Sequence, residues 1–313
     1  MSEINNPHDK FFKKVFSSKS NTEEFLLNYL PAHVVSHLDL KSLEYAKESF
    51  VDKHLAEYLS DLLCRVNFKD GSRGYIYLLF EHKSYQEPLT AFHILRYMVK
   101  IWELWLKERV GDRFFPVIIP MIVYHGENEW QVKLNYRDLF RYPEDMVSFI
   151  PDFQYLLWDA SGYCDQEIKG KVMLRVALLT MKYIYREDLR EHLPELFGLL
   201  RDFSEKKTGM EFIETMIRYL LNAAPKEHLT HEDVRDAVER ALSDKGGAIM
   251  PAIADSLIEE GRKQGLQEGT QQGIMQKARE DVIDSLEARF DIVPETVIKI
   301  ISKIEGHSLL NSA

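Results

Sequence analysis

The stretch DLLCRVNFKDGSRGYIYLLFEHKS, residues 61–84, decides the fold. Two apolar, partly alternating segments flank the turn sequence KDGSRG at 69–74, and this arrangement is typical of a β-hairpin. The second segment, YIYLLF at 75–80, is followed at once by the polar residues EHK at 81–83. Either the strand runs out into solvent at these residues, or it carries a functional site.

The segments around the hairpin have helical and strand patterns. Apolar residues recur at helical spacing in 9–16, 21–31 and 89–110, so each of these segments is expected to form a helix. Segments 114–126 and 153–161 are expected to be strands, and the two prolines of the first argue for an edge strand or a break. These elements predict an α/β fold with a sheet covered by helices.

Two local signals are weaker. Asn21 or Thr22 is a candidate cap for the helix at 21–31, and Pro31 is expected to stop that helix. Residues 42–60 have a mixed pattern, which is compatible with a helix or a loop.

From about residue 165 onward the pattern becomes helical. Amphipathic segments are separated by short turns, and Thr230 and Asp233 form a capping-box variant at the start of one of them. We therefore expect a helical region over residues 166–250 and an all-helical C-terminal part of the chain.

The tail, residues 251–313, contains glycines at every fourth position: Gly261, Gly265, Gly269 and Gly273. Four residues turn a helix by about 400°, so these glycines would form a slowly drifting stripe. Each costs about 1 kcal/mol relative to alanine in a helix interior, and close packing on a partner would offset that loss. The tail is therefore either a flexible polar linker or a helix packed on another copy of the chain, which would make the protein a homo-oligomer.

Composition limits the class of protein. The 313 residues, 45% of them hydrophobic, are enough to bury a sizeable core. Cys64 and Cys164 have no CxxC partner, which argues against a disulfide scaffold or structural zinc and suits a cytoplasmic protein. No run of about 18 apolar residues is present, so we expect no membrane span.

The net charge of −10 argues against a general nucleic-acid binder. Residues 1–110 hold 15 Lys and Arg against 15 Asp and Glu, so the acidic excess lies in residues 111–313, which hold 25 against 35. A local basic groove in the first part is compatible with this distribution, although the acidic total gives it no support.

Polar residues converge at one end of the predicted hairpin. Alternate residues of a strand share a face, so Glu81 and Lys83 point the same way and His82 points the other way. Asp61 opens the preceding strand and falls roughly opposite Glu81. Isolated buried charges are costly, and Mg²⁺ is typically held by one or two carboxylates together with phosphate oxygens. The pattern therefore predicts that Asp61 and Glu81 bind magnesium, while Lys83 assists the attacking water.

A structural interpretation of the same residues stays open. Glu81 and Lys83 are compatible with a solvated strand end, and Asp61 with a cap, because so short a pattern matches by chance often. His125, at the end of the strand at 114–126, could face a ligand, but a role in fixing its loop is favoured. Asp159 could enter the site or cap the turn that follows it, and the cap is favoured. Phosphate contacts are expected from a set of basic residues: Lys10, Lys13, Lys14, Arg96 and Lys100.

Several strings of the chain resemble the Rpn family of recombination-promoting nucleases, also described as YhgA-like putative transposases. They are HDKFFKKVF, the Asp of SDLLCRV, YIYLLFEHKS, AFHILRYM and FPVIIPMIVYHGENEW. The resemblance covers about residues 7–200, and the strings around YLLFEHKS and PMIVYHG are fairly specific. The family belongs to the PD-(D/E)XK nuclease superfamily.

The resemblance implies a PD-(D/E)XK restriction-endonuclease-like core at residues 5–165. It also implies a Mg²⁺-dependent DNA endonuclease that promotes RecA-independent recombination. The motif acids match Asp61 and Glu81, and the motif lysine matches Lys83. Family members often have glutamine at that last position, so this chain is closer to the general form of the superfamily.

The resemblance also bears on other positions. His93 departs from the arginine that the family often has there, which puts a phosphate contact at this position in doubt, whereas Arg96 and Tyr97 remain candidates for DNA contact. Glu23 or Glu24 would match the first-helix acid of many superfamily enzymes. The rival interpretation is a non-catalytic interaction protein on a retired nuclease core, which the acidic C-terminal half keeps open.

Overall fold

The computed structural model describes residues 7–46, 62–81, 86–108 and 114–242, together with some helical residues between 266 and 301. For residues 78–81 and 108 it describes the backbone only. The chain divides into two compact units, Met1–Gly247 and Ala248–Ala313. Within the described part, no helix is both long enough and apolar enough to cross a bilayer.

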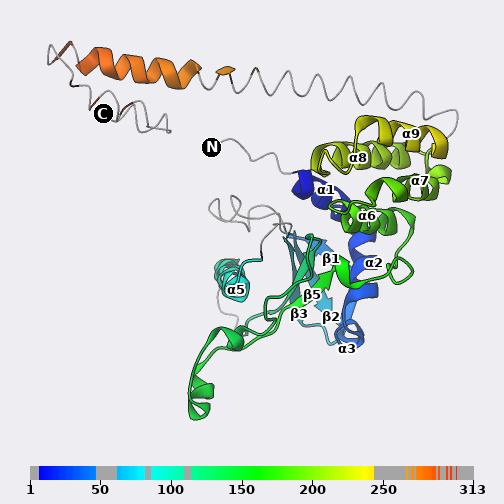
Figure 1. Cartoon of the computed structure of the whole chain (residues 1–313). Coiled ribbons are helices and arrows are strands. Elements are labelled where there is room, and N and C mark those ends of the chain that lie inside the picture. The colour runs from blue at the N-terminus through cyan, green and yellow to red at the C-terminus, as the bar shows by residue number, and fades with distance from the viewer. Residues whose placement is uncertain are drawn as a thin grey trace. The chain divides into compact units, whose positions relative to one another are not determined.

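The first unit contains a mixed five-stranded sheet in the order β1-β2-β3-β4-β5 (Figure 1). The strands are β1 (Leu38–Tyr45), β2 (Leu62–Phe68), β3 (Arg73–Glu81), β4 (Val117–Tyr124) and β5 (Leu156–Asp159). β1, β2 and β3 pair antiparallel, whereas β3, β4 and β5 pair parallel. The predicted α/β class and the hairpin are therefore confirmed.

The hairpin turn follows from its residue types. The Asp70 carboxylate accepts hydrogen bonds from the Ser72 backbone N at 2.8 Å and the Ser72 hydroxyl at 2.6 Å, and these bonds lower the pKa of Asp70. Gly71 has φ of 87°, a conformation that side chains disfavour. The turn thus places β2 beside β3, with Leu62 paired to Leu78.

Helix α5 (Thr90–Glu108) connects β3 to β4 and covers one face of the sheet. Parallel strands need such a crossover. Its Ile94, Met98 and Ile101 are buried in one core cluster with Tyr75 of β3 and Ile122 of β4.

The opposite face packs on α2 (Lys19–Tyr29). Trp158 of β5 is fully buried there, with its ring 5.8 Å from Phe25 and 5.6 Å from Tyr29, and it stacks on Tyr163 at 5.7 Å. Successive residues of a strand face opposite sides, and Leu157 accordingly packs on the α5 side. The sheet is thus flanked by helices on both faces.

Three local expectations are wrong. Of the segment 42–60, expected to be a helix or loop, residues 42–45 belong to strand β1, which is held by its pairing with β2, and residues 47–60 lie outside the described part. β4 is a central strand rather than the expected edge strand. Because β5 pairs only with residues 121–124, Pro120 has a paired neighbour on the β3 side alone, and its missing N–H is tolerated. Asn21 and Thr22 lie inside α2, where their side chains donate to carbonyl groups at the end of the preceding helix.

That preceding helix, α1 (Pro7–Phe16), packs on a helix far away in sequence. Phe11 stacks on Tyr219 with a centroid distance of 4.1 Å, and His8 Nδ1 lies 3.0 Å from the Tyr219 hydroxyl. Tyr219 belongs to α8, one of the α-helices that the structure describes in the first unit beyond β5: α6 (Val172–Tyr183), α7 (Leu189–Leu199), α8 (Lys207–Ala223) and α9 (His231–Leu242). Helix α1 therefore buries part of its apolar face against α8.

The capping box is confirmed at the start of α9. The Asp233 backbone N donates to the Thr230 hydroxyl at 3.1 Å, and the Thr230 backbone N donates to the Asp233 carboxylate at 2.9 Å. Both cysteines are free, and burial raises the pKa of the Cys64 thiol to about 12. The predicted boundaries at 165 and 250, and the all-helical C-terminal part as a whole, stay predictions.

In the second unit, residues 273–286 are helical, and Ala278 and Ile301 lie in a small apolar cluster. A Cβ added to Gly269 or Gly273 would meet no atom within 4 Å, so packing within the described chain does not account for these glycines. Gly261 and Gly265 lie outside the described residues. Self-association through this tail stays a prediction, which sedimentation of the full chain would test directly.

Candidate functional site

Three parallel strands end together at one edge of the sheet, here called the carboxyl edge. Glu81, Tyr124 and Asp159 are the last residues of β3, β4 and β5, and they are aligned in register across the three strands. Neighbouring strands lie about 4.8 Å apart, so the backbones of Glu81 and Asp159 are roughly 10 Å apart. Ligands of open α/β sheets bind outside the carboxyl ends of the strands, which makes this edge the candidate functional site.

The predicted catalytic residues are described only in part. Glu81 ends β3 at the carboxyl edge. Asp61 and Lys83, the other two predicted catalytic residues, lie outside the described part, as does His82, which was predicted to point away from the site. Leu62, which follows Asp61 in sequence, begins β2 and pairs with Leu78 of β3, so β2 begins near the edge where β3 ends. The grouping of Asp61, Glu81 and Lys83, and their Mg²⁺, stay predictions.

The described side chains were compared for groups of residues that could bind a metal ion. Among the side chains that the structure describes, which exclude those of Asp61 and Glu81, no three His, Cys, Asp or Glu residues are grouped so as to hold a metal ion.

Asp159 has a structural role at the carboxyl edge. Its Oδ1 accepts hydrogen bonds from the Ser161 backbone N at 2.9 Å and the Ser161 hydroxyl at 2.7 Å, which cap the short turn at Ala160–Gly162 as predicted. Its Oδ2 accepts a bond from the Trp130 backbone N at 2.8 Å. One carboxylate therefore fixes both the turn after β5 and the loop after β4.

His125 follows β4 directly and is buried, with 1% of its surface exposed. Its ring lies 5.2 Å from His8 and stacks on Tyr185 at 5.8 Å. His8 is itself held by two tyrosine hydroxyls: Nδ1 lies 3.0 Å from Tyr219, and Nε2 lies 2.9 Å from Tyr185. This packing agrees with a structural role for His125, which joins the carboxyl edge to α1 and to Tyr185 after α6.

The two acids of α2 differ in their surroundings. Glu23 lies 3.5 Å from Lys19 Nζ in a solvent-exposed ion pair. Oε2 of Glu24 is buried, and it has no hydrogen-bond partner within the described part of the chain. Because a buried polar oxygen without a partner is costly, Glu24 is the acid of this pair that has an unused acceptor.

The predicted DNA contacts have different surroundings. Lys13 and Lys14 are exposed on α1, and Arg96 is exposed on α5. Lys100 forms an ion pair of 2.8 Å with a glutamate one turn later. Tyr97 is half-buried, with its ring 5.7 Å from a tyrosine of β3. Contact between these residues and DNA stays a prediction.

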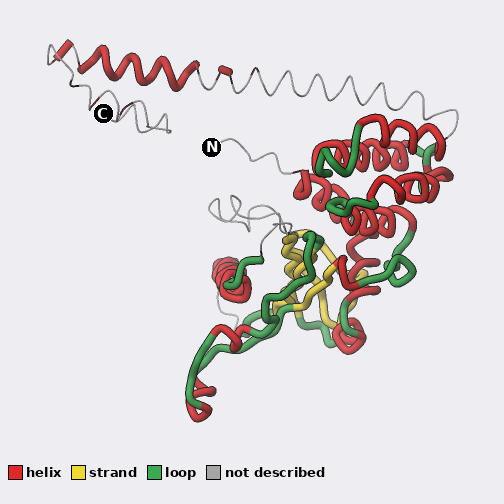
Figure 2. The backbone as a smooth tube through the Cα atoms, viewed as in Figure 1, coloured by secondary structure: helices red, strands yellow, loops and turns green. Residues whose placement is uncertain are grey.

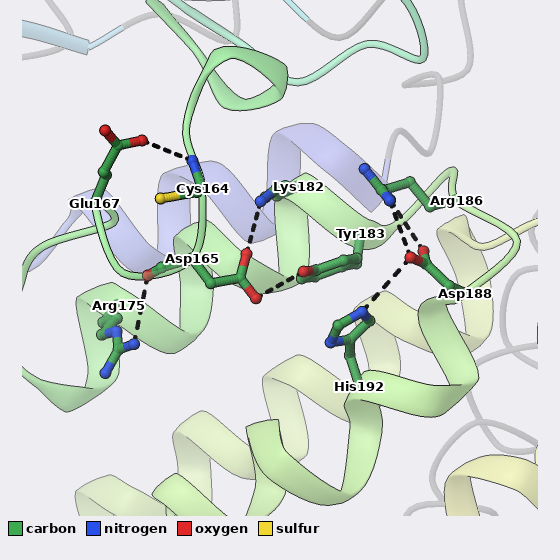
Figure 3. Close-up of polar contacts among 9 residues, drawn as sticks. All are labelled: Cys164, Asp165, Glu167, Arg175, Lys182, Tyr183, Arg186, Asp188 and His192. Atoms are coloured by element: carbon green, nitrogen blue, oxygen red, sulfur yellow. Dashed lines mark hydrogen bonds and ion pairs between the residues drawn. The ribbon is translucent and has the colours of Figure 1, made fainter.

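A second polar cluster joins the loop after β5 to α6 (Figure 3). Asp165 accepts hydrogen bonds from Lys182 Nζ at 2.6 Å and from the Tyr183 hydroxyl at 2.7 Å. Burial acts to raise the pKa of Asp165, but the hydrogen bonds from Lys182 and Tyr183 outweigh it and hold the pKa below its ordinary value. The Lys182 side chain is only 9% exposed, whereas that of Asp165 is 26% exposed, so the lysine is the shielded partner of this ion pair.

The cluster continues toward α7. Asp188 accepts hydrogen bonds from Nε and Nη2 of Arg186, both at 2.9 Å. Asp188 also lies 3.6 Å from Nε2 of His192, whose ring stacks on Tyr183 at 3.7 Å (Figure 3). None of these residues carried a sequence signal, because the partners of Asp165 lie 17 and 18 positions away.

Replacing Asp165 by Asn is expected to lower the free energy of unfolding by about 1–3 kcal/mol at pH 7, because the shielded Lys182 loses its charged partner. A carboxylate with a lowered folded-state pKa stabilises the fold above its unfolded pKa, and this stability is lost as the pH falls through the folded pKa. The difference between wild type and variant should therefore be full at neutral pH and shrink below about pH 4.

Urea unfolding at several pH values measures this difference. Asp202→Asn is the matched control, since Asp202 is exposed, and a surface change of this kind is expected to stay within about 0.5 kcal/mol. A difference for Asp165→Asn that does not change with pH would contradict the ion-pair explanation.

Comparison with known proteins identifies the family. A family model described as "Putative transposase, YhgA-like" matches residues 6–211. The chain is 30% identical over 268 residues to "Inactive recombination-promoting nuclease-like protein RpnE" of Escherichia coli (strain K12), covering 85% of this chain and 86% of that protein. It is 29% identical over 258 residues to "Recombination-promoting nuclease RpnA" of the same strain, covering 82% and 85%.

A third relative, "Recombination-promoting nuclease RpnD" of Escherichia coli O157:H7, is 30% identical over 195 residues, covering 62% of this chain and 74% of that protein. No solved structure matches the chain. Because the family model covers more than half of the 313 residues and the relatives align over most of their length, the chain belongs to the YhgA-like putative transposase family, together with the Rpn proteins.

Proposed function

We propose that the protein is a Mg²⁺-dependent DNA endonuclease of the PD-(D/E)XK type that promotes RecA-independent recombination. The observation that carries the proposal is Glu81 at the carboxyl edge, as the last residue of β3. Two of the relatives described above are named recombination-promoting nucleases, and this supports the same activity here.

Asp61 and Glu81 are the proposed magnesium ligands, with Glu24 as the proposed first-helix acid. The donor set fits the metal, because Mg²⁺ prefers carboxylate oxygens and usually takes only one or two from the protein. The buried, unpartnered Oε2 of Glu24 fits a carboxylate that meets a cation. When bound, the ion would activate water and neutralise charge on the phosphate.

The other residues would bind and orient the DNA. Lys83 would hold or release a proton at the attacking water and stabilise negative charge that develops on the phosphate. Exposed Lys13, Lys14 and Arg96 would neutralise phosphates along the backbone, with Tyr97 and Lys100 as further proposed contacts. These contacts would position the DNA without recognising its base sequence.

The direct test incubates supercoiled plasmid with the purified full chain, with Mg²⁺ or with EDTA. We expect nicking with Mg²⁺, none with EDTA, and a loss of about 100-fold or more for Asp61→Ala and Lys83→Ala, in line with the removal of a group that acts on the transition state. Equal nicking by wild type and both variants would contradict the proposed catalytic roles of Asp61 and Lys83, because the activity would then come from a contaminant.

A second function is favoured by one specific observation. The chain is 30% identical to a relative named inactive, so a non-catalytic interaction protein on a nuclease core is the alternative. This alternative predicts no Mg²⁺-dependent nicking by the wild type in the same assay.

A further inference from the structure

Gln86 uses its whole side-chain amide to hold the loop that follows β4. Its Nε2 donates to the Glu129 backbone O at 2.6 Å and to the Tyr124 hydroxyl at 3.3 Å, while its Oε1 accepts from the Gln131 backbone N at 2.5 Å. A residue in a parallel strand bonds a neighbouring chain in the same way, through a C=O and an N–H two residues apart. The Gln86 amide thus makes the two hydrogen bonds that a backbone residue of a parallel neighbouring strand would make.

The loop that Gln86 holds is fixed to the carboxyl edge at other points. The Tyr124 hydroxyl donates to the Asn128 backbone O at 2.8 Å, and the Trp130 backbone N donates to Asp159 at 2.8 Å. A Cβ added to Gly126 would lie 2.1 Å from the Tyr124 hydroxyl oxygen, so the loop passes the ring more closely than a side chain allows. Loop 126–131 is therefore built onto the same two residues, Tyr124 and Asp159, that align with Glu81.

We infer that Gln86 is a positioning residue for Glu81, which deepens the proposed function and rests on it. Glu81 is held on one side by its register with Tyr124, and the chain that leaves β3 is tied five residues later, through Gln86, to the loop fixed on Tyr124. Gln86 also donates to the hydroxyl of Tyr124 itself, the residue paired with Glu81, and a loop that is already fixed beside a site loses little conformational entropy when a ligand binds there. Gln86 would thus contribute to the order of the carboxyl edge without contacting the metal.

Gln86→Glu tests this inference with an almost isosteric change. The variant keeps an acceptor for the Gln131 N–H but turns a carboxylate oxygen toward the Glu129 carbonyl, so one bond becomes a repulsion. Calorimetry with MgCl₂ on the full chain is expected to show about 10-fold weaker Mg²⁺ binding, the size typical of losing a partner that orients a ligand. Hydrogen exchange of peptides that cover 126–131 is expected to become about 10-fold faster.

Gln131→Glu is the matched control. It makes the same chemical change two residues from Glu129, but Gln131 is exposed and contributes its backbone N, so neither measurement should move by more than about 2-fold. Equal shifts in both variants would assign the effect to charge and overturn the positioning role.

The remaining outcomes separate the inference from the proposed function. Unchanged exchange in Gln86→Glu would show that the amide does not hold the loop. Faster exchange with unchanged Mg²⁺ binding would overturn the link to Glu81. A wild type that binds Mg²⁺ but does not nick plasmid would refute the endonuclease while leaving the positioning of Glu81 to be judged by calorimetry. A wild type that binds no Mg²⁺ would overturn both.

Discussion

Glu81→Gln is expected to lower the rate of Mg²⁺-dependent plasmid nicking by about 10²–10⁴-fold. The substitution keeps the size of the side chain at the end of β3 and removes the charge, so the proposed magnesium site loses one of the carboxylates that such sites usually use. Loss of an electrostatic group that acts in the transition state has an effect of about 2.7–4 kcal/mol or more on the barrier. Nicking rates at saturating DNA, measured over a range of Mg²⁺ concentrations, give both the rate and the metal requirement.

The two acids of α2 supply a matched pair for the same measurement. Glu24→Gln is expected to reduce nicking by about 10-fold or more, because the buried Oε2 of Glu24 has no hydrogen-bond partner among the described residues. Glu23→Gln should stay within about 2-fold of wild type, since this residue forms a surface pair with Lys19. Equal effects of the two changes, or full activity of Glu81→Gln at low Mg²⁺, would refute the proposed ligand set.

The largest expected effect on stability comes from Trp158. Replacing it by Ala should lower the free energy of unfolding by about 3–5 kcal/mol, the range for deleting a large buried aromatic side chain. The residue is completely buried and contacts Phe25, Tyr29 and Tyr163, so the resulting cavity would separate β5 from α2. Denaturant unfolding with far-ultraviolet circular dichroism measures the loss.

Phe149→Ala is the control for deleting a large aromatic side chain. Phe149 is 78% exposed and lies in the extension between β4 and β5, which projects away from the sheet (Figure 2). Its removal should change the free energy of unfolding by less than about 0.5 kcal/mol. A loss for Trp158→Ala no larger than that of the control would mean that the packing between β5 and α2 contributes little to stability.

The parts of the fold that were predictable are those set by local chemistry. The hairpin follows from alternation and from the turn residues around Gly71, and α5 follows from an uninterrupted apolar stripe over about five turns. β1 was not predicted from LDLKSLEY, because its alternation changes phase between Leu40 and Leu43, and the pairing with β2 shifts register within the same stretch. Pro120 likewise suggests an edge strand. The structure places it in a central strand, at a position that pairs with β3 but lies before the first residue paired with β5.

The candidate site shows the same division. Glu81 could be placed at the end of a strand from the sequence, whereas its grouping with Asp61 and Lys83 stays a prediction that rests on alternation and the family resemblance. Gln86 carried no signal, because it bonds backbone groups 43 and 45 positions away. Side chains that bond main chain leave the partner's residue type free, so no sequence pattern records them.

The contact between α1 and α8 has a consequence for synthesis of the protein. His8 and Tyr219 are 211 positions apart, and a ribosome that adds about 5–20 residues per second needs roughly 10–40 s to make the chain between them. For that interval α1 exists without the surface that buries Phe11. Newly made chains therefore expose the phenylalanines of α1 to chaperones, and α1 reaches its final packing only after α8 has been made.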